Sequence, residues 1–125
     1  MRVLERAFKI ADVLVHHDPN DQSSRVRLGI CGTLLAANLR HTDPRRALSV
    51  YDHALQHMAE IRSPAIERLE SWLLCDSSYA LRSLGRPAEA RRRLERAFAV
   101  LKDLTLYPAD KLTAEDDVDN TLQAP

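Results

Sequence analysis

The chain has few residues that interrupt or cross-link a fold, with three glycines, six prolines and two cysteines among 125 residues. Cys31 and Cys75 lie 44 residues apart, with no second cysteine or histidine at metal-ligand spacing beside either of them. The sequence therefore indicates neither a disulfide framework nor a zinc knuckle. We expect both cysteines to be small apolar residues of the core in a reducing cytoplasm.

Net charge and long apolar runs are absent as well. The 18 basic and 18 acidic side chains cancel, so no overall field attracts nucleic acid or an anionic membrane. Charges fall in every turn of residues 1–10, a pattern that excludes a signal peptide or membrane span there. With 45% apolar and 29% charged residues, the composition is that of one soluble globular domain. We expect a cytoplasmic protein that binds neither nucleic acid nor membrane.

What the chain does have is helical periodicity, interrupted at a few clear boundaries. Apolar residues recur at i, i+3, i+4 and i+7, and no window alternates as a strand would. Ser23 or Ser24 is the expected N-cap of one helix, and Asp43-Pro44 and Ser63-Pro64 combine a capping side chain with a first-turn proline. The sequence predicts an all-α domain over residues 1–107, with helices at about 3–17, 23–41, 44–62, 64–84 and 87–105. Residues 108–125 are predicted to form an acidic tail, in which residues 113–117 have the charges of a short helix start.

The chain aligns with itself. Leu4-Glu5-Arg6-Ala7-Phe8 recurs as Leu94-Glu95-Arg96-Ala97-Phe98, and Tyr51-Asp52-His53-Ala54-Leu55 falls in the same helical phase. A small residue therefore recurs as Ala7, Ala54 and Ala97, at spacings of 47 and 43 residues. Because a small side chain lets two helices approach closely, the three helices are predicted to share one packing role.

The pattern within these helices resembles the tetratricopeptide repeat, a hairpin of helices A and B with small residues where the two cross. In the last unit the resemblance is carried by Leu74 and Ser78 of helix A, Gly85 at the turn, and Ala90, Leu94 and Ala97 of helix B. The preceding unit matches at Ala47, Tyr51 and Ala54. It departs from the pattern in helix A, where Leu35 and Asn38 replace a small residue and an aromatic.

The resemblance covers residues 25 to about 104. It implies a right-handed solenoid of about two and a half repeats, in which the first helix is a helix B without its helix A. The repeat is longer than the usual ~34 residues, as expected of helices about one turn longer. Since about three stacked units are needed for stability, we expect a piece of a longer array, or one completed by a second copy. The resemblance further implies a bacterial regulatory protein, some of which carry a kinase domain.

Proteins of this kind bind partners in a concave groove lined by helix A. By the resemblance, the residues expected to contact a partner are Leu39, Arg40, Trp72, Cys75, Tyr79 and Arg82, beside Gly29, Gly32 and Ala36. Trp72, Tyr79 and Arg82 each join a large contact area to a polar group, as residues that dominate interface energies do. The alternative is that Trp72 and Tyr79 pack on the neighbouring hairpin as core.

Two further clusters are weighed against plainer interpretations. His53 and His57 are four residues apart, so they share a helix face, as metal-binding pairs do. No third ligand is evident, so we expect a solvated face and assign no metal and no other cofactor. The basic run 91–93 with Arg96 can meet phosphate or an acidic peptide, but Glu89 and Glu95 stand at pairing distance. We expect a solvated, salt-bridged face there.

The leading functional interpretation is an interaction module or scaffold that binds a peptide or protein in the groove lined by helix A. The second is a structural segment that joins copies or domains through its exposed terminal helices, for example beside a kinase domain, with no separate ligand. An enzyme ranks last, because the sequence shows no nucleophile with its base, no glycine-rich phosphate loop and no metal cluster. We therefore expect a non-enzymatic chain with a protein, a peptide or a further copy of itself as partner.

Overall fold

The computed structural model describes residues 2–103, which form five α-helices and contain no strand. The all-α prediction is therefore confirmed for this part of the chain, whereas the expected acidic tail lies outside the described residues. The helices are α1 (Arg2–His17), α2 (Gln22–Leu39), α3 (Pro44–Met58), α4 (Pro64–Ser83) and α5 (Pro87–Asp103).

Short polar side chains begin three of the helices. The carboxylate of Asp21 accepts a hydrogen bond from the backbone N–H of Ser23 at 3.0 Å, so Asp21, rather than either predicted serine, caps α2. Asp43 accepts from the N–H of Arg46, and the Ser63 hydroxyl accepts from the N–H of Ile66, each at 3.2 Å. These bonds satisfy amide groups that have no partner within the first turn of a helix.

Helices α4 and α3 end in different ways. Gly85 follows α4 with a φ of +73°, the left-handed conformation that glycine adopts without steric cost. The N–H of Gly85 donates to the Arg82 carbonyl, and the next N–H donates to the Leu81 carbonyl, which closes the helix as expected. Helix α3 ends at Met58, four residues before its predicted end. There Arg62 folds back to donate to the Met58 carbonyl and pairs with Glu70 of α4.

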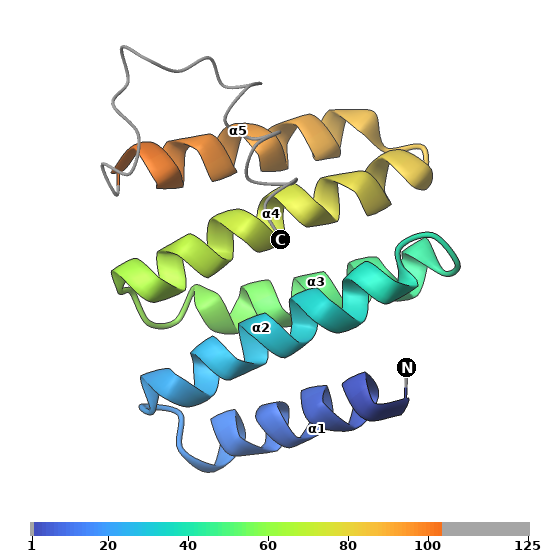
Figure 1. The fold of residues 1–125 in the computed structure, drawn as a ribbon. Helices are drawn as coiled ribbons and strands as arrows, with labels where there is room; N and C mark the ends of the chain where they lie inside the picture. The colour runs from blue at the N-terminus through green and yellow to red at the C-terminus, as the bar shows by residue number, and fades with distance from the viewer. Residues whose placement is uncertain (1, 104–125) are drawn as a thin grey trace.

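The helices form a stack in which each packs on the next in sequence, and α2 also contacts α4 (Figure 1). Helix α3 lies behind α2 and α4, so it covers only one side of α2 (Figure 1). Helices α1 and α5 lie at the two ends of the stack (Figure 1).

Small residues lie where the helices cross. Ala54 and Ala97 are fully buried, as the internal repeat predicts, and Ala7 is half-buried. A Cβ atom on Gly32 of α2 would lie 3.1 Å from Cβ of Ala54 and 3.2 Å from the ring of Phe8. Gly32 therefore allows α1 and α3 to pack closely against α2 at one level. No helix among residues 2–103 is long and apolar enough to cross a membrane.

Candidate functional site

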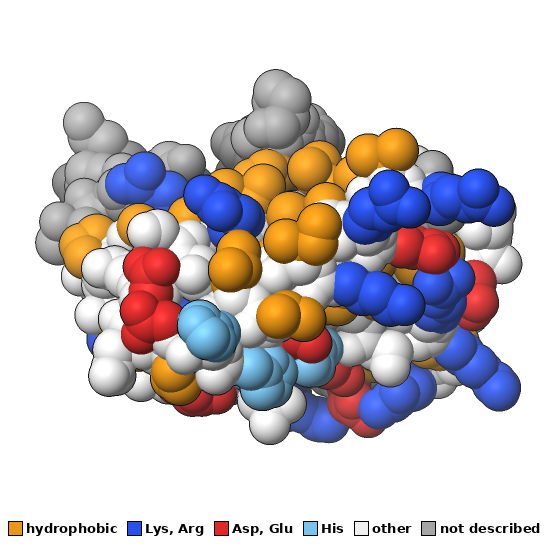
Figure 2. Space-filling model, turned by 90° about the horizontal axis from the view of Figure 1, so that it is seen from below, with side chains coloured by type: hydrophobic (Ala, Val, Ile, Leu, Met, Phe, Trp, Pro, Cys, Tyr) orange, Lys and Arg blue, Asp and Glu red, His pale blue; other side chains and the backbone are white. Residues whose placement is uncertain are grey.

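The large hydrophobic side chains that remain exposed are confined to the first two helices. Among the described residues they are Val3, Ile10 and Val13 of α1 and Ile30 and Leu34 of α2, and we call these five residues the apolar face. Leu34 is 48% exposed and Val3 is 79% exposed. Figure 2 shows hydrophobic side chains gathered on the side of the molecule that α1 presents. Helices α3, α4 and α5 have no equivalent within residues 44–103.

The spacing of the apolar face follows the two helices. Ile30 and Leu34 are four residues apart on α2, and the half-buried Val26 precedes them by four more. Together they form a ridge along one side of α2. A hollow beside this ridge is lined by Val26, Arg27 and Ile30, by the polar start of α2 with its cap Asp21, and by Ala65 from the start of α4. The apolar face is thus continued by a depression between α2 and α4.

Three basic side chains lie on the same two helices as the apolar face. Arg6 and Lys9 of α1 and Arg27 of α2 are exposed, and none of them forms an ion pair with another residue between positions 2 and 103. The carboxylates of α1 are engaged on another side, since Glu5 pairs with Arg46 of α3 at 3.0 Å. Three unpaired basic side chains therefore lie on the two helices of the apolar face, although the whole chain is neutral.

The structure brings together two of the six residues expected to bind a partner. The guanidinium carbon of Arg40 lies 5.0 Å above the ring centroid of Tyr79, a cation–π contact between α2 and α4. Trp72 lies two turns before Tyr79 on α4 and packs partly against the core, while Arg82 is exposed. Trp72 and Tyr79 are half-buried, so they serve the core as well as the surface.

The other two expected residues, Leu39 and Cys75, lie within the core, at 4% and 0% exposure. Gly29, Gly32 and Ala36, named as their neighbours, are buried as well. These residues occupy the faces of α2 and α4 that contact other helices. The expected positions on α2 were taken over in the register of a shorter repeat. That register selects the buried side of α2, whereas Ile30 and Leu34 are on its exposed side. Because α2 is otherwise apolar, its sequence does not show that Leu34 is exposed and not part of the core.

Arg40 also belongs to a polar network centred on Asp76. Asp76 of α4 accepts hydrogen bonds from Arg40 Nη1 at 2.6 Å and from the hydroxyl of Tyr51, which lies on α3. Burial, and then the hydrogen bond to Asp76, raise the pKa of Tyr51, so the phenol stays protonated and donates. The network ties α2, α3 and α4 together and fixes the Arg40 side chain over Tyr79.

A second hollow, of about 490 Å³, lies between α3, α4 and α5. Its walls include Glu70, Glu89, Arg92, Arg93 and Arg96. Arg93 is engaged by Asp52 of α3 at 2.7 Å, and Glu89 and Glu70 are engaged by other arginines. The predicted salt-bridged face is confirmed for Arg91, which pairs with Glu95 at 3.4 Å.

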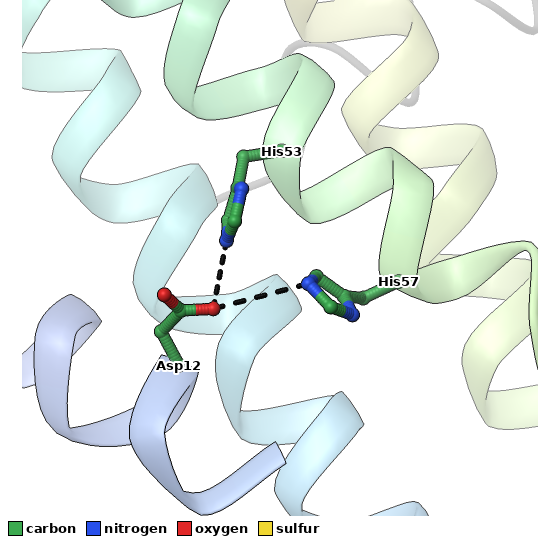
Figure 3. A group of neighbouring side chains, drawn as sticks. All are labelled: Asp12, His53 and His57. Carbon is green, nitrogen blue, oxygen red and sulfur yellow. Dashed lines mark hydrogen bonds and ion pairs between the residues drawn. The ribbon is translucent and has the colours of Figure 1, made fainter. Parts of the chain in front are cut away.

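The histidine pair on α3 has a third neighbour that is distant in sequence. Asp12 Oδ1, on α1, lies 2.7 Å from His53 Nε2 and 3.8 Å from His57 Nε2 (Figure 3). The side chain of His57 is only 12% exposed and that of His53 is 36% exposed. The expectation of a solvated face was therefore wrong for His57, whereas His53 remains partly exposed.

Aromatic and carboxylate neighbours fix the two rings. His53 meets the ring of Phe8 edge to face at 5.7 Å, and the rings of His53 and His57 are 5.0 Å apart. On its other side, His57 Nδ1 lies 3.5 Å from Glu60 Oε1. Burial, and then the neighbouring His53, lower the pKa of His57, which keeps its imidazole neutral near pH 7. A neutral imidazole has a lone pair available to a ligand.

No protein-family model matches this chain, and neither a curated protein nor a solved structure is significantly similar to it.

Proposed function

We propose that this chain is a protein-interaction module that binds an amphipathic helix of another protein on the apolar face of α1 and α2. The observation that supports the proposal most is the confinement of the exposed large hydrophobic side chains of residues 2–103 to these two adjacent helices. Contiguous exposed apolar surface on a folded domain marks a site of association.

The shape of the surface favours a helix as its occupant. The ridge of Val26, Ile30 and Leu34 runs along α2, and the hollow between α2 and α4 lies beside it. An amphipathic helix places apolar side chains at i, i+3, i+4 and i+7, which match such a ridge and its adjoining groove. Fully burying a completely exposed Leu or Ile is worth about 1.5–3 kcal/mol, and about half of that is left for side chains that are 44% and 48% exposed. Ile30 and Leu34 are proposed as the main anchors because they stand on the ridge beside the hollow.

The charges favour a different protein over a second copy of this chain. If two copies met symmetrically through the apolar face, Arg6, Lys9 and Arg27 of one copy would approach the same residues of the other. Such like-charge contacts oppose association. A partner helix flanked by Asp and Glu would instead neutralise these three side chains. We therefore propose an acidic amphipathic helix as the partner.

The tetratricopeptide resemblance supports the same class of function. In that arrangement, α2 and α4 are the helices A that line the concave side, and Arg40, Trp72, Tyr79 and Arg82 border the groove between them. We propose that these four residues extend the contact surface beyond the apolar face. The chain acts by binding rather than by catalysis in this proposal.

Site-specific photo-cross-linking in the native host tests the proposal. A photoreactive amino acid replaces Leu34 in the full chain, and a matched chain carries it at Ser49, which is exposed on α3. We expect a discrete adduct with another protein from position 34 and not from position 49. Mass spectrometry of the adduct should place the cross-link in an acidic amphipathic helix of the partner.

Other cross-linked products would identify a different occupant of the apolar face. A product with twice the mass of the chain would replace the proposed partner by a second copy. A cross-link confined to one chain would assign the apolar face to another segment of the same molecule. Equal adducts from positions 34 and 49, or none from position 34, would contradict binding at the apolar face.

A further inference from the structure

We propose that Asp12, His53 and His57 form a binding site for a zinc ion between α1 and α3. The three residues offer one carboxylate oxygen and two imidazole nitrogens, which lie within 4.8 Å of one another. The proposal concerns the contact between α1 and α3, which includes none of the five residues of the apolar face, and does not depend on the proposed partner.

The donor set has the chemistry that zinc prefers. Zinc in proteins is held by His nitrogen at about 2.0–2.1 Å and by carboxylate oxygen at similar distances, in tetrahedral geometry. Two histidines with one carboxylate, together with a water or a fourth side chain, make a known type of zinc coordination. A more demanding ion such as Mg²⁺ requires oxygen ligands and would not select this pair of imidazoles.

The separations fit such an ion after small movements. Tetrahedral bonds of about 2.0 Å place neighbouring ligand atoms about 3.3 Å apart. Asp12 Oδ1 is 2.7 Å from His53 Nε2 and 3.8 Å from His57 Nε2, so each distance is within about 0.6 Å of that value. Figure 3 shows both rings turning their Nε2 atoms toward the same carboxylate oxygen. All three ligand atoms lie within 4.8 Å of one another, so small changes in the three side-chain rotamers bring them to the spacing that an ion requires.

The surroundings also orient the ligands. His57 Nδ1 is buried, makes no hydrogen bond and faces Glu60 Oε1 at 3.5 Å. A small shift lets Nδ1–H donate to Glu60, and a carboxylate is one of the usual outer acceptors for metal-bound histidines. Arg25, whose charge also faces His57, is paired with Glu60 at 3.1 Å and so is partly neutralised.

His16 provides a candidate for the fourth position. It lies one turn after Asp12 on α1, its Nδ1 is 3.6 Å from Asp12 Oδ1, and its ring centroid is 5.6 Å from that of His57. Its side chain is 64% exposed, and its Nδ1 contacts the Asp12 backbone carbonyl at 2.8 Å, so it has to give up that contact to turn toward an ion held by the other three. Such a closed site joins the end helix of the stack to α3 and predicts that zinc stabilises the fold.

Metal titration of the full chain without an affinity tag tests the proposal. Co²⁺ is used as the spectroscopic probe, because its visible absorption reports tetrahedral coordination, and Zn²⁺ is then added in competition. We expect one ion per chain, and a rise in the thermal midpoint when zinc is present. The variants Asp12→Asn and His53→Gln should weaken binding by at least about tenfold. His41→Ala removes an exposed histidine outside the site and should leave it unchanged.

The variants also separate a metal site from a purely structural contact. If the Asp12–His53 contact serves only to hold α1 in place, Asp12→Asn lowers the thermal midpoint by the same amount with and without zinc. That result, or Co²⁺ binding without the tetrahedral absorption, would overturn the proposal. Equal loss of binding in His41→Ala and His53→Gln would also overturn it. Circular dichroism confirms that each variant remains helical, and His16→Ala then tests the fourth position.

Discussion

A Cβ atom on Gly32 would lie 3.1 Å from the Cβ atom of Ala54, so the backbones of α2 and α3 approach each other closely at this level. The same Cβ atom would lie 3.2 Å from the ring of Phe8 on α1. Three helices therefore depend on the absence of one side chain.

Replacement of Gly32 tests that contact. Gly32→Val adds three carbon atoms against Ala54 and Phe8, and we expect it to destabilise the domain by about 1–3 kcal/mol. The matched change Ala37→Val lies at a half-exposed position of the same helix and should change the stability by less than about 0.5 kcal/mol. Urea unfolding measures both variants. Equal stability of the two would show that α1 or α3 can move away without cost.

The buried acid of α4 is the second test. Asp76 is 5% exposed and accepts from both Tyr51 and Arg40. Asp76→Ala leaves a buried phenol and a partly buried guanidinium without their partner, and we expect a loss of about 3–5 kcal/mol in unfolding free energy. Glu95→Ala breaks only an exposed pair with Arg91 and should cost less than about 0.5 kcal/mol. A small loss in Asp76→Ala would contradict a structural role for the network.

High pH tests the protonation of Tyr51. Because burial raises its pKa above that of an unfolded tyrosine, about 10, the folded protein holds a proton that the unfolded chain releases. The stabilisation is complete below pH 10 and is lost as the pH rises further. We expect the wild type to lose stability between about pH 9 and pH 11 more steeply than Tyr51→Phe does. Parallel losses in the two proteins would contradict a buried, protonated phenol.

The turn after α4 depends on backbone conformation rather than on space. A Cβ atom on Gly85 would meet nothing within 4 Å, yet its φ of +73° is unfavourable for other residues. Gly85→Ala should therefore cost about 1–2 kcal/mol, and Gly85→Asn should cost less because asparagine tolerates this conformation better. Thermal unfolding distinguishes the three proteins. An alanine variant as stable as the wild type would show that the turn adopts another conformation.

Most of the helices could be predicted from the sequence, because their boundaries have local causes. Asp43, Ser63 and Gly85 act on amide or carbonyl groups within a few residues of themselves, so their roles appear in the sequence. The end of α3 could not be predicted, because it depends on the contact of Arg62 with Glu70 across the turn.

The candidate sites were less predictable. The partners of Asp12 lie 41 and 45 residues away on another helix, and no sequence spacing reveals that contact. The exposure of Ile30 and Leu34 depends on which side of α2 the other helices cover. In contrast, the burial of Ala54 and Ala97 followed from the internal repeat, since that pattern reports a contact made in each hairpin.

The affinity for the cross-linked partner tests the central claim most directly. Leu34→Glu places a charge on the apolar face at a position outside the buried core, and Ser49→Glu makes the same change in charge on α3. We expect Leu34→Glu to raise the Kd by at least about tenfold, which corresponds to about 1.4 kcal/mol, with Ser49→Glu equal to the wild type. An unchanged Kd in Leu34→Glu would contradict binding on the face of α1 and α2.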